Sequence, residues 1–272
     1  MTVSSEGCIM DLLQSVILGL IQGTTEWLPI SSTGHLRVAQ YFFGLNVPLL
    51  FDVLLHFATL MVILVYFRVD IKNLLLSLLR RDFHSSSGRL ILPIIVGSIP
   101  TGIIGVVFGN DLDAYFNSLP LLAGGFIVSG LFLFASKYGV EKKDSISIPV
   151  AVAIGVMQGL SIVPSISRSG FTIAFMLLLG IKREISFKFS FLLSIPAVVG
   201  ALGLTLYQDY SAIELAGIGT AEVVVAMAAT IAISFLALKL LRKTVIAGKF
   251  YMFAFYCFII GAVLLILNSM GF

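Results

Sequence analysis

Six stretches of this chain are long and apolar enough to cross a lipid bilayer, and they restrict the fold more than any other feature. A helix needs about 20 mostly apolar residues to span the hydrocarbon core. The stretches lie at 49–67, 89–108, 119–137, 186–207, 219–240 and 250–269. Because lipid offers no water to unpaired backbone groups, spanning segments of this length are helical. The sequence therefore predicts an all-α integral membrane protein with six transmembrane helices.

The composition supports a membrane protein and excludes a soluble binding module. Of the 272 residues, 58% are hydrophobic and only 11% are charged, whereas a soluble domain has roughly 25% charged residues. The net charge of +3 is too small to suggest a nucleic-acid partner. Cys8 and Cys257 lie near opposite ends of the sequence, without metal-ligand or redox spacing, so we expect no chemistry from either thiol.

Two further apolar regions, 9–44 and 149–181, are interrupted near the middle by proline, serine and glycine. The interruptions read LPISSTG (28–34) and VPSISRSG (163–170). Proline disfavours helix in the residue before it, and serine ahead of a helical pattern is a typical N-cap. Each half is too short to span a bilayer. We therefore predict two re-entrant hairpins, each built as helix, break, helix.

The two interrupted regions resemble each other at a fixed offset of 136 residues. The matching pairs are Gly19 with Gly155, Gln22 with Gln158, Gly23 with Gly159, Ile30 with Ile166, Ser31 with Ser167, Thr33 with Ser169, Gly34 with Gly170, and Gly44 with Gly180. Each copy is followed by three spans, an odd number, so the second copy must be inverted in the membrane. The sequence thus predicts a single membrane domain over 1–272, built from inverted repeats 9–137 and 149–269, as in transport-type folds.

The distribution of basic residues predicts the orientation. If the 45–49 linker is outside, the cytoplasmic segments hold fifteen of the seventeen Lys and Arg residues, and the outer loops hold none. This satisfies the positive-inside rule for a multi-pass protein and places the first hairpin on the extracytoplasmic side. The two exceptions, Arg37 and Arg168, both lie in the hairpins, where an ionisable group suggests function.

The facing breaks have the chemistry of a phosphate site. Two half-helix N-termini would direct free N–H groups and positive dipole ends at a shared space. Arg168 adds a guanidinium suited to bidentate phosphate binding. The expected phosphate-binding residues are Ser31, Thr33, Gly34, Ser167, Ser169 and Gly170. Phosphate or pyrophosphate is the ligand that this set favours.

The first break also carries residues for acid–base chemistry. Glu26 and His35 supply a carboxylate and an imidazole, and a neighbouring serine such as Ser32 is a candidate nucleophile. Gln22 lies one helical turn before Glu26, on the same face. We expect Glu26, Ser32, His35 and Arg168 to be catalytic, with Gln22, Arg37 and Asp52 as accessory residues.

Several assignments stay open from the residues alone. Asp52 and His56 share a helix face, and either borders the site or makes a helix-packing hydrogen bond. Arg37 either binds phosphate or extends to the membrane interface. The serines by themselves are compatible with plain N-caps.

At these motifs the sequence resembles the undecaprenyl pyrophosphate phosphatase family, also called the bacitracin-resistance family. The matching stretches are GLIQGTTEWLPISSTGHL (19–36), FDVLLHFATLMVILVYFR (51–68) and VPSISRSGFTIAFMLLLGI (163–181). The resemblance implies a cell-membrane enzyme that hydrolyses a polyprenyl pyrophosphate lipid to the monophosphate, with its active site on the extracytoplasmic side. It implies active-site roles for Glu26, Ser31, Ser32, Thr33, His35, Ser167, Arg168 and Ser169.

The same resemblance implies a divalent cation, Mg²⁺ or Ca²⁺, for which Glu26 is the candidate ligand. A homodimer is a further hypothesis. Two positions depart from the family pattern: Gln22 replaces a glutamate, and Ser165 replaces a glycine. A neutral amide can neither take a proton nor balance a cation, so the first departure bears on rate and metal dependence.

Two questions about mechanism and class remain open at this point. Either Ser32 attacks the phosphate, with His35 or Glu26 as base, or His35 attacks directly. The alternative function is a prenyl-phosphate transporter or flippase without catalysis, which inverted repeats and Gln22 would suit.

Overall fold

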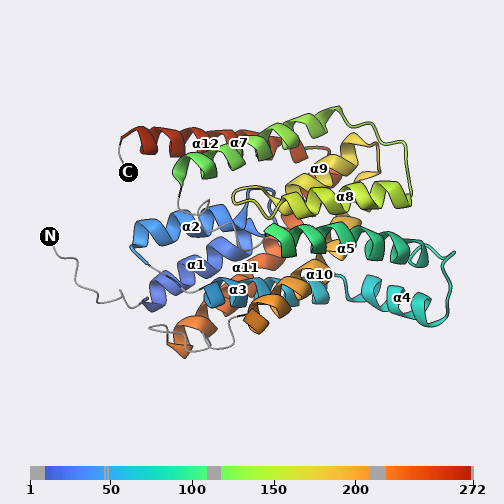
Figure 1. Ribbon diagram of the computed structural model, residues 1–272, viewed down its shortest axis with the longest axis horizontal. Helices are drawn as coiled ribbons and strands as arrows, with labels where there is room; N and C mark the ends of the chain where they lie inside the picture. The colour runs from blue at the N-terminus through green and yellow to red at the C-terminus, as the bar shows by residue number, and fades with distance from the viewer. Residues whose placement is uncertain (1–9, 46, 48, 109–117, 209–218, 271–272) are drawn as a thin grey trace.

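The computed structural model of this chain describes residues 10–45, 47, 49–108, 118–208 and 219–270 (Figure 1). Regular structure in these ranges is helical, apart from an isolated bridge between Lys143 and Ile181. The helices are α1 (Leu12–Thr25), α2 (Ser32–Phe43), α3 (Leu49–Tyr66), α4 (Arg68–Leu79), α5 (Gly88–Phe108), α7 (Leu119–Ala135), η2 (Ser136–Tyr138), α8 (Ile148–Leu160), α9 (Arg168–Leu178), α10 (Arg183–Gln208), α11 (Thr220–Ile246), η4 (Phe250–Met252) and α12 (Phe253–Ser269). The predicted all-α architecture is confirmed for these ranges.

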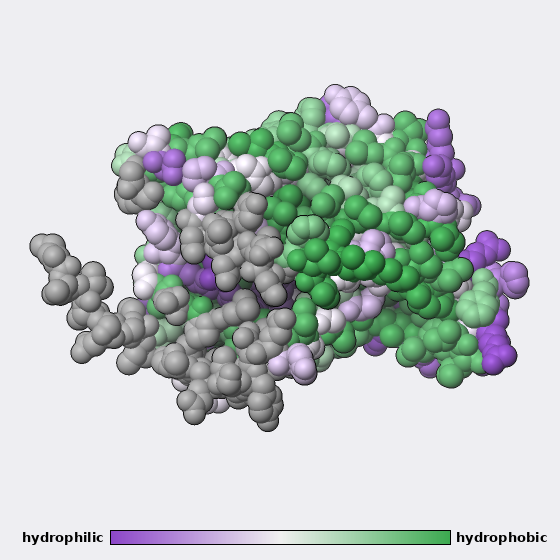
Figure 2. All heavy atoms as spheres, in the orientation of Figure 1, coloured by the Kyte–Doolittle hydropathy of each residue, from purple (hydrophilic) through white to green (hydrophobic). Residues whose placement is uncertain are grey.

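Five of the described helical segments are long and apolar enough to cross a membrane. They are Gly88–Phe108, Leu119–Tyr138, Arg183–Leu204, Thr220–Ile246 and Phe250–Ser269. Figure 2 shows hydrophobic residues over much of the visible face, with hydrophilic residues at the end that holds the exposed 80–84 segment. The chain is therefore a multi-pass membrane protein.

The remaining expected span, 49–67, is part of a bent pair of helices. α3 turns by 74° into α4, so the two count as a sixth span only if they are taken together. Helix α4 lies between the expected spans 49–67 and 89–108, where the sequence predicts no helix. Asp70 on α4 forms an ion pair with Lys188 on α10 at 2.5 Å, and this contact attaches the extra helix to the bundle.

The two predicted breaks lie where the sequence placed them. The first separates α1 from α2 and the second separates α8 from α9, and these four helices have 11 to 14 residues each. The α2 and α9 helices start at equivalent serine N-caps, Ser31 and Ser167, whose side chains accept from the N–H groups of Gly34 and Gly170. Both therefore start with the hydrogen-bond pattern that the serines predict.

Helices of the first half of the chain pack against helices of the second half, so that the two halves exchange helix partners. α1 packs against α11, whereas α8 packs against α5, and α7 lies beside α12 (Figure 1). Glycines allow the close approach: a Cβ on Gly23 would lie 2.4 Å from the Thr230 carbonyl oxygen, and one on Gly155 would lie 1.9 Å from that of Gly97. Small residues of this kind let membrane helices approach until their backbones touch.

We expect Gly23→Ala to destabilise the protein, because the added methyl group meets the backbone of α11, which has no room to move. The expected loss in the free energy of unfolding is about 1–3 kcal/mol. Thermal unfolding in detergent measures it. Gly124→Ala is the matched control, since a Cβ at Gly124 has nothing within 4 Å. Equal midpoints for the two variants would contradict the close packing of α1 on α11.

Candidate active site

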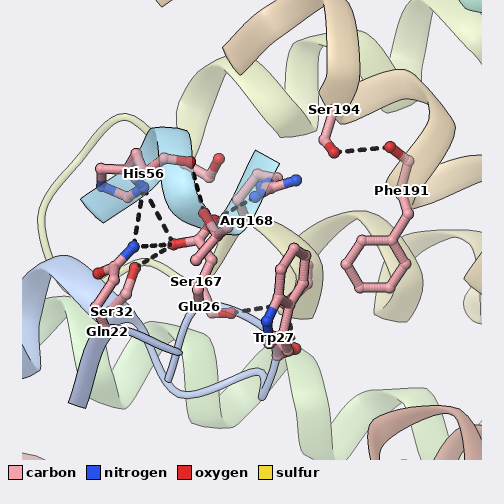
Figure 3. Close-up of polar contacts among 12 residues, drawn as sticks. Gln22, Glu26, Trp27, Ser32, His56, Ser167, Arg168, Phe191 and Ser194 are labelled. Atoms are coloured by element: carbon pink, nitrogen blue, oxygen red, sulfur yellow. Dashed lines mark hydrogen bonds and ion pairs between the residues drawn. The ribbon is translucent and has the colours of Figure 1, made fainter. Parts of the chain in front are cut away.

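A carboxylate from the first break and a guanidinium from the second meet at the centre of the site (Figure 3). Arg168 Nη2 lies 2.5 Å from Glu26 Oε1, and only 8% of the Glu26 side chain is exposed. Glu26 follows the last turn of α1, and Arg168 is the first residue of α9. The helix breaks thus bring together two charges that are 142 residues apart in sequence.

The second oxygen of Glu26 accepts a hydrogen bond from a serine hydroxyl. Ser32 Oγ donates to Glu26 Oε2 at 2.7 Å. This distance is within the range needed for proton transfer between a nucleophile and its base. The predicted grouping of Glu26, Ser32 and Arg168 is therefore present in the structure.

His56 also lies at Glu26, together with Gln22. His56 Nδ1 is 3.4 Å from Glu26 Oε2. Gln22 Nε2 is 3.2 Å from the same oxygen and 3.1 Å from His56 Nδ1. Of the two roles that the sequence allows for His56, the structure shows that it borders the site. Gln22 contributes a neutral hydrogen-bond donor to Glu26.

His35 does not make the expected pair with Glu26. Its Nδ1 is 2.7 Å from the Ser31 carbonyl oxygen, and its Nε2 is 2.7 Å from the Tyr256 hydroxyl. The ring stacks on Tyr256 and meets the edge of Phe126. The expected pair does not form because α2 directs the His35 side chain toward α7 and α12, away from Glu26.

Arg37 and Asp52 form a separate group with Gln40. Arg37 Nη2 is 3.5 Å from Asp52 Oδ2, and Gln40 Nε2 donates to Asp52 Oδ1 at 2.9 Å. None of the three lines the cavity described below. From the sequence, Arg37 could either bind phosphate or extend to the membrane interface. In the structure it pairs with the Asp52 carboxylate instead.

A cavity of about 860 Å³ joins the two breaks. Its polar wall includes the expected residues Glu26, Ser31, Ser32, Thr33, Ser167 and Arg168, together with His56. The first turns of α2 and α9 therefore face the same cavity. The first N–H groups of a helix have no hydrogen-bond partner inside that helix. Such N-termini bind anions.

The other predicted phosphate ligands have structural partners. The N–H groups of Gly34 and Gly170 are bonded to the capping serines. Ser169 Oγ donates to the Trp27 carbonyl oxygen at 3.2 Å. These three residues join the breaks to each other and to their helices, and they lie outside the cavity lining.

The cavity continues from the polar wall along an apolar wall made by α5 and α10. The residues there include Gly102, Gly105, Val106, Ala197, Ala201, Leu204 and Tyr207. Ser98, Thr101, Gln158 and Ser194 add polar groups that sequence reasoning missed. The repeat offers a signal for one of them, because Gln158 is the counterpart of Gln22.

Within the described part of the chain, one guanidinium nitrogen of Arg168, a residue that lines this cavity, lacks a hydrogen-bond partner. This nitrogen, Nη1, is buried. A buried donor without a partner is costly unless a ligand supplies the acceptor.

The residues present do not form a protein cage for a divalent cation. No group of three or more His, Cys, Asp and Glu side chains suited to a metal occurs in the described ranges. Both oxygens of Glu26 already face donors, from Arg168 on one side and from Ser32 and Gln22 on the other. A cation would need most of its ligands from a bound substrate.

Comparison with known proteins identifies the family. A model of the family described as bacitracin resistance protein BacA matches residues 15–263. The undecaprenyl-diphosphatase of Desulforapulum autotrophicum is 40% identical over 274 residues, which cover 94% of this chain and 98% of that protein. That of Carboxydothermus hydrogenoformans is also 40% identical, over 96% of this chain and 99% of its own length. The undecaprenyl-diphosphatase of Methanosphaera stadtmanae is 36% identical over the same shares. The chain therefore belongs to the bacitracin resistance protein BacA family.

Proposed function

We propose that this protein hydrolyses undecaprenyl diphosphate, or a similar polyprenyl diphosphate, to the monophosphate and inorganic phosphate, recycling a lipid carrier for cell-wall or glycan synthesis. The observation that carries the proposal is the Ser32 hydroxyl at 2.7 Å from Glu26, with Arg168 on the other carboxylate oxygen. A nucleophile, a base and a cation at one cavity are the parts that phosphoryl transfer needs. The names of the relatives support the same activity.

In the mechanism we favour, Ser32 Oγ attacks the terminal phosphorus while its proton passes to Glu26. The bond from that phosphorus to the bridging oxygen breaks, and Glu26 gives the proton to the departing prenyl phosphate. Water then attacks the phosphoserine as Glu26 takes its proton, and Ser32 Oγ leaves with that proton. Arg168 and the N-termini of α2 and α9 stabilise the charge on the phosphoryl oxygens.

The apolar wall of the cavity supports a lipid substrate. The diphosphate would bind at the polar end, between the two breaks, and the first prenyl units would lie along α5 and α10. A single cavity with a polar wall and an apolar wall suits a molecule with one highly charged end and one hydrocarbon chain. The cavity thus offers hydrogen-bond donors to the head group at one end and small apolar residues to the tail along α5 and α10.

We also propose the finer layout of six transmembrane helices with two re-entrant hairpins, related as inverted repeats 9–137 and 149–269. The matched N-caps at Ser31 and Ser167 support it, as does the exchange of helix partners between the halves. With the basic loops inside, the first hairpin and the active site face the extracytoplasmic side of the cell membrane. The single domain and a homodimer remain predictions.

The predicted phosphate contacts of Ser31, Thr33, Ser167 and Arg168 belong to this proposal. We replace His35 with His56 as the imidazole beside Glu26, because His56 Nδ1 is 3.4 Å from the carboxylate. Mg²⁺ or Ca²⁺ remains a prediction, as an ion carried by the diphosphate. The protein groups of the site do not fit a resident cation, so no step above depends on one.

A prenyl-phosphate transporter is the less favoured alternative, because the relatives bear the name of a diphosphatase. Liposomes that contain the purified protein distinguish the two. An enzyme releases inorganic phosphate from undecaprenyl diphosphate, whereas a transporter only moves the lipid between leaflets.

Arg168→Ala should lower the rate of phosphate release by on the order of 100-fold, because it removes a transition-state donor and leaves Glu26 without its cation. The rate is measured with undecaprenyl diphosphate and purified, folded protein. Arg242→Ala is the control, since Arg242 pairs with Glu184 on the exposed surface. Full activity in Arg168→Ala would falsify the assignment of the site.

Gln22→Glu should make the reaction more dependent on a divalent cation. The Gln22 nitrogen is 3.2 Å from Glu26, so a glutamate there sets two carboxylates side by side. Like charges at this distance favour protonation or a bridging cation. We expect the ratio of rates with Mg²⁺ and with chelator to rise about tenfold over that of the unsubstituted protein. Identical ratios would show that Gln22 does not set the cation requirement.

A further inference from the structure

His35 and Tyr256 form a hydrogen-bonded pair that joins the first break to the last helix. The Ser31 carbonyl only accepts hydrogen bonds, so His35 Nδ1 at 2.7 Å from it must carry the proton. In a neutral imidazole Nε2 is then the acceptor, and the Tyr256 hydroxyl donates to it at 2.7 Å. The centroids of the two rings are 5.6 Å apart and their planes are 16° from parallel, so Tyr256 also restrains the orientation of the imidazole ring.

The residue that receives this hydrogen bond has a strained backbone. Ser31 has φ 66° and ψ 104°, a conformation that residues with a side chain rarely adopt. Such a conformation persists only where its surroundings hold it. The next residue is Ser32, whose hydroxyl is 2.7 Å from Glu26. The direction of the Ser32 side chain therefore depends on the peptide that His35 holds.

The helix that carries Tyr256 contacts the first break at a second point. Cys257, the next residue on α12, lies with its sulfur 3.6 Å from the Pro29 carbonyl oxygen. On α7, the helix beside α12, the Ser129 hydroxyl donates to the Ser165 carbonyl and accepts from the Ser167 N–H of the second break, both at 3.1 Å. Each break is thus held by a helix outside its own hairpin.

We propose that Tyr256 is a positioning residue that acts through His35, holding the Ser31 peptide so that Ser32 stays on Glu26. His35 is then a positioning residue as well, and Glu26 is the base. The catalytic part of this inference rests on the proposed function.

The test compares Tyr256→Phe with Tyr251→Phe, a matched change in η4, outside the site. Tyr256→Phe should lower kcat by roughly two- to tenfold, the range for one lost neutral hydrogen bond, with KM unchanged. Tyr251→Phe should leave both constants unchanged. An unchanged kcat in Tyr256→Phe, or an effect on KM alone, overturns the proposal.

His35 variants separate positioning from direct catalysis. The Asn amide can place an N–H donor near the position of His Nδ1, so His35→Asn should keep most of the activity, whereas His35→Ala should lose on the order of 10- to 100-fold. Equal inactivity of both variants would make His35 a catalytic group and overturn the proposal.

Hydrogen exchange tests the positioning without any turnover. Tyr256→Phe should speed exchange of the amides in 28–36 and leave those in 163–170 unchanged, because only the first break loses a contact. Unchanged exchange in 28–36 overturns the proposal. If the unsubstituted protein releases no phosphate while this difference is present, only the proposed function fails.

Discussion

The ion pair between Glu26 and Arg168 is the contact on which the arrangement of the two breaks depends. A single buried charge is strongly disfavoured, so each of these side chains requires the other. Removing one partner of a buried ion pair typically costs about 3–5 kcal/mol, because the remaining charge has no compensation. The pair therefore favours a structure in which the two hairpins touch, and it selects against any packing that separates them.

Glycines at equivalent positions make that approach sterically feasible. A Cβ on Gly34 would lie 2.9 Å from Ser165 Oγ of the second break, and one on Gly170 would lie 3.2 Å from Pro29 Cβ of the first. Ser165 itself has φ 66°, a backbone conformation that favours glycine. The two breaks have the same caps but different chemistry, since the counterpart of Glu26 is Ile162. One break supplies the base and nucleophile, and the other supplies the cation.

The sequence predicts those features whose signals are local. Proline beside serine and glycine predicts both breaks, and Ser31 and Ser167 predict the caps. Glu26 and Arg168 could be assigned to one site because each is an ionisable residue in a break. His56 could not be chosen over His35, because the choice depends on how α3 is rotated against α1, and sequence spacing does not encode this rotation. The bend before α4 has no local signal in the sequence. Its N-cap is Phe67, which makes no side-chain hydrogen bond, and no Pro, Gly or Ser marks the turn.

In the proposed mechanism, residues from both breaks act as one catalytic unit. A double-mutant cycle on kcat/KM, with Glu26→Gln, Arg168→Gln and the double variant, tests it most directly. Groups that act together give strongly non-additive effects. We expect the double variant to be about as slow as the slower single variant. If the loss in kcat/KM of the double variant were the product of the two single losses, the breaks would act independently and the proposed catalytic unit would be wrong.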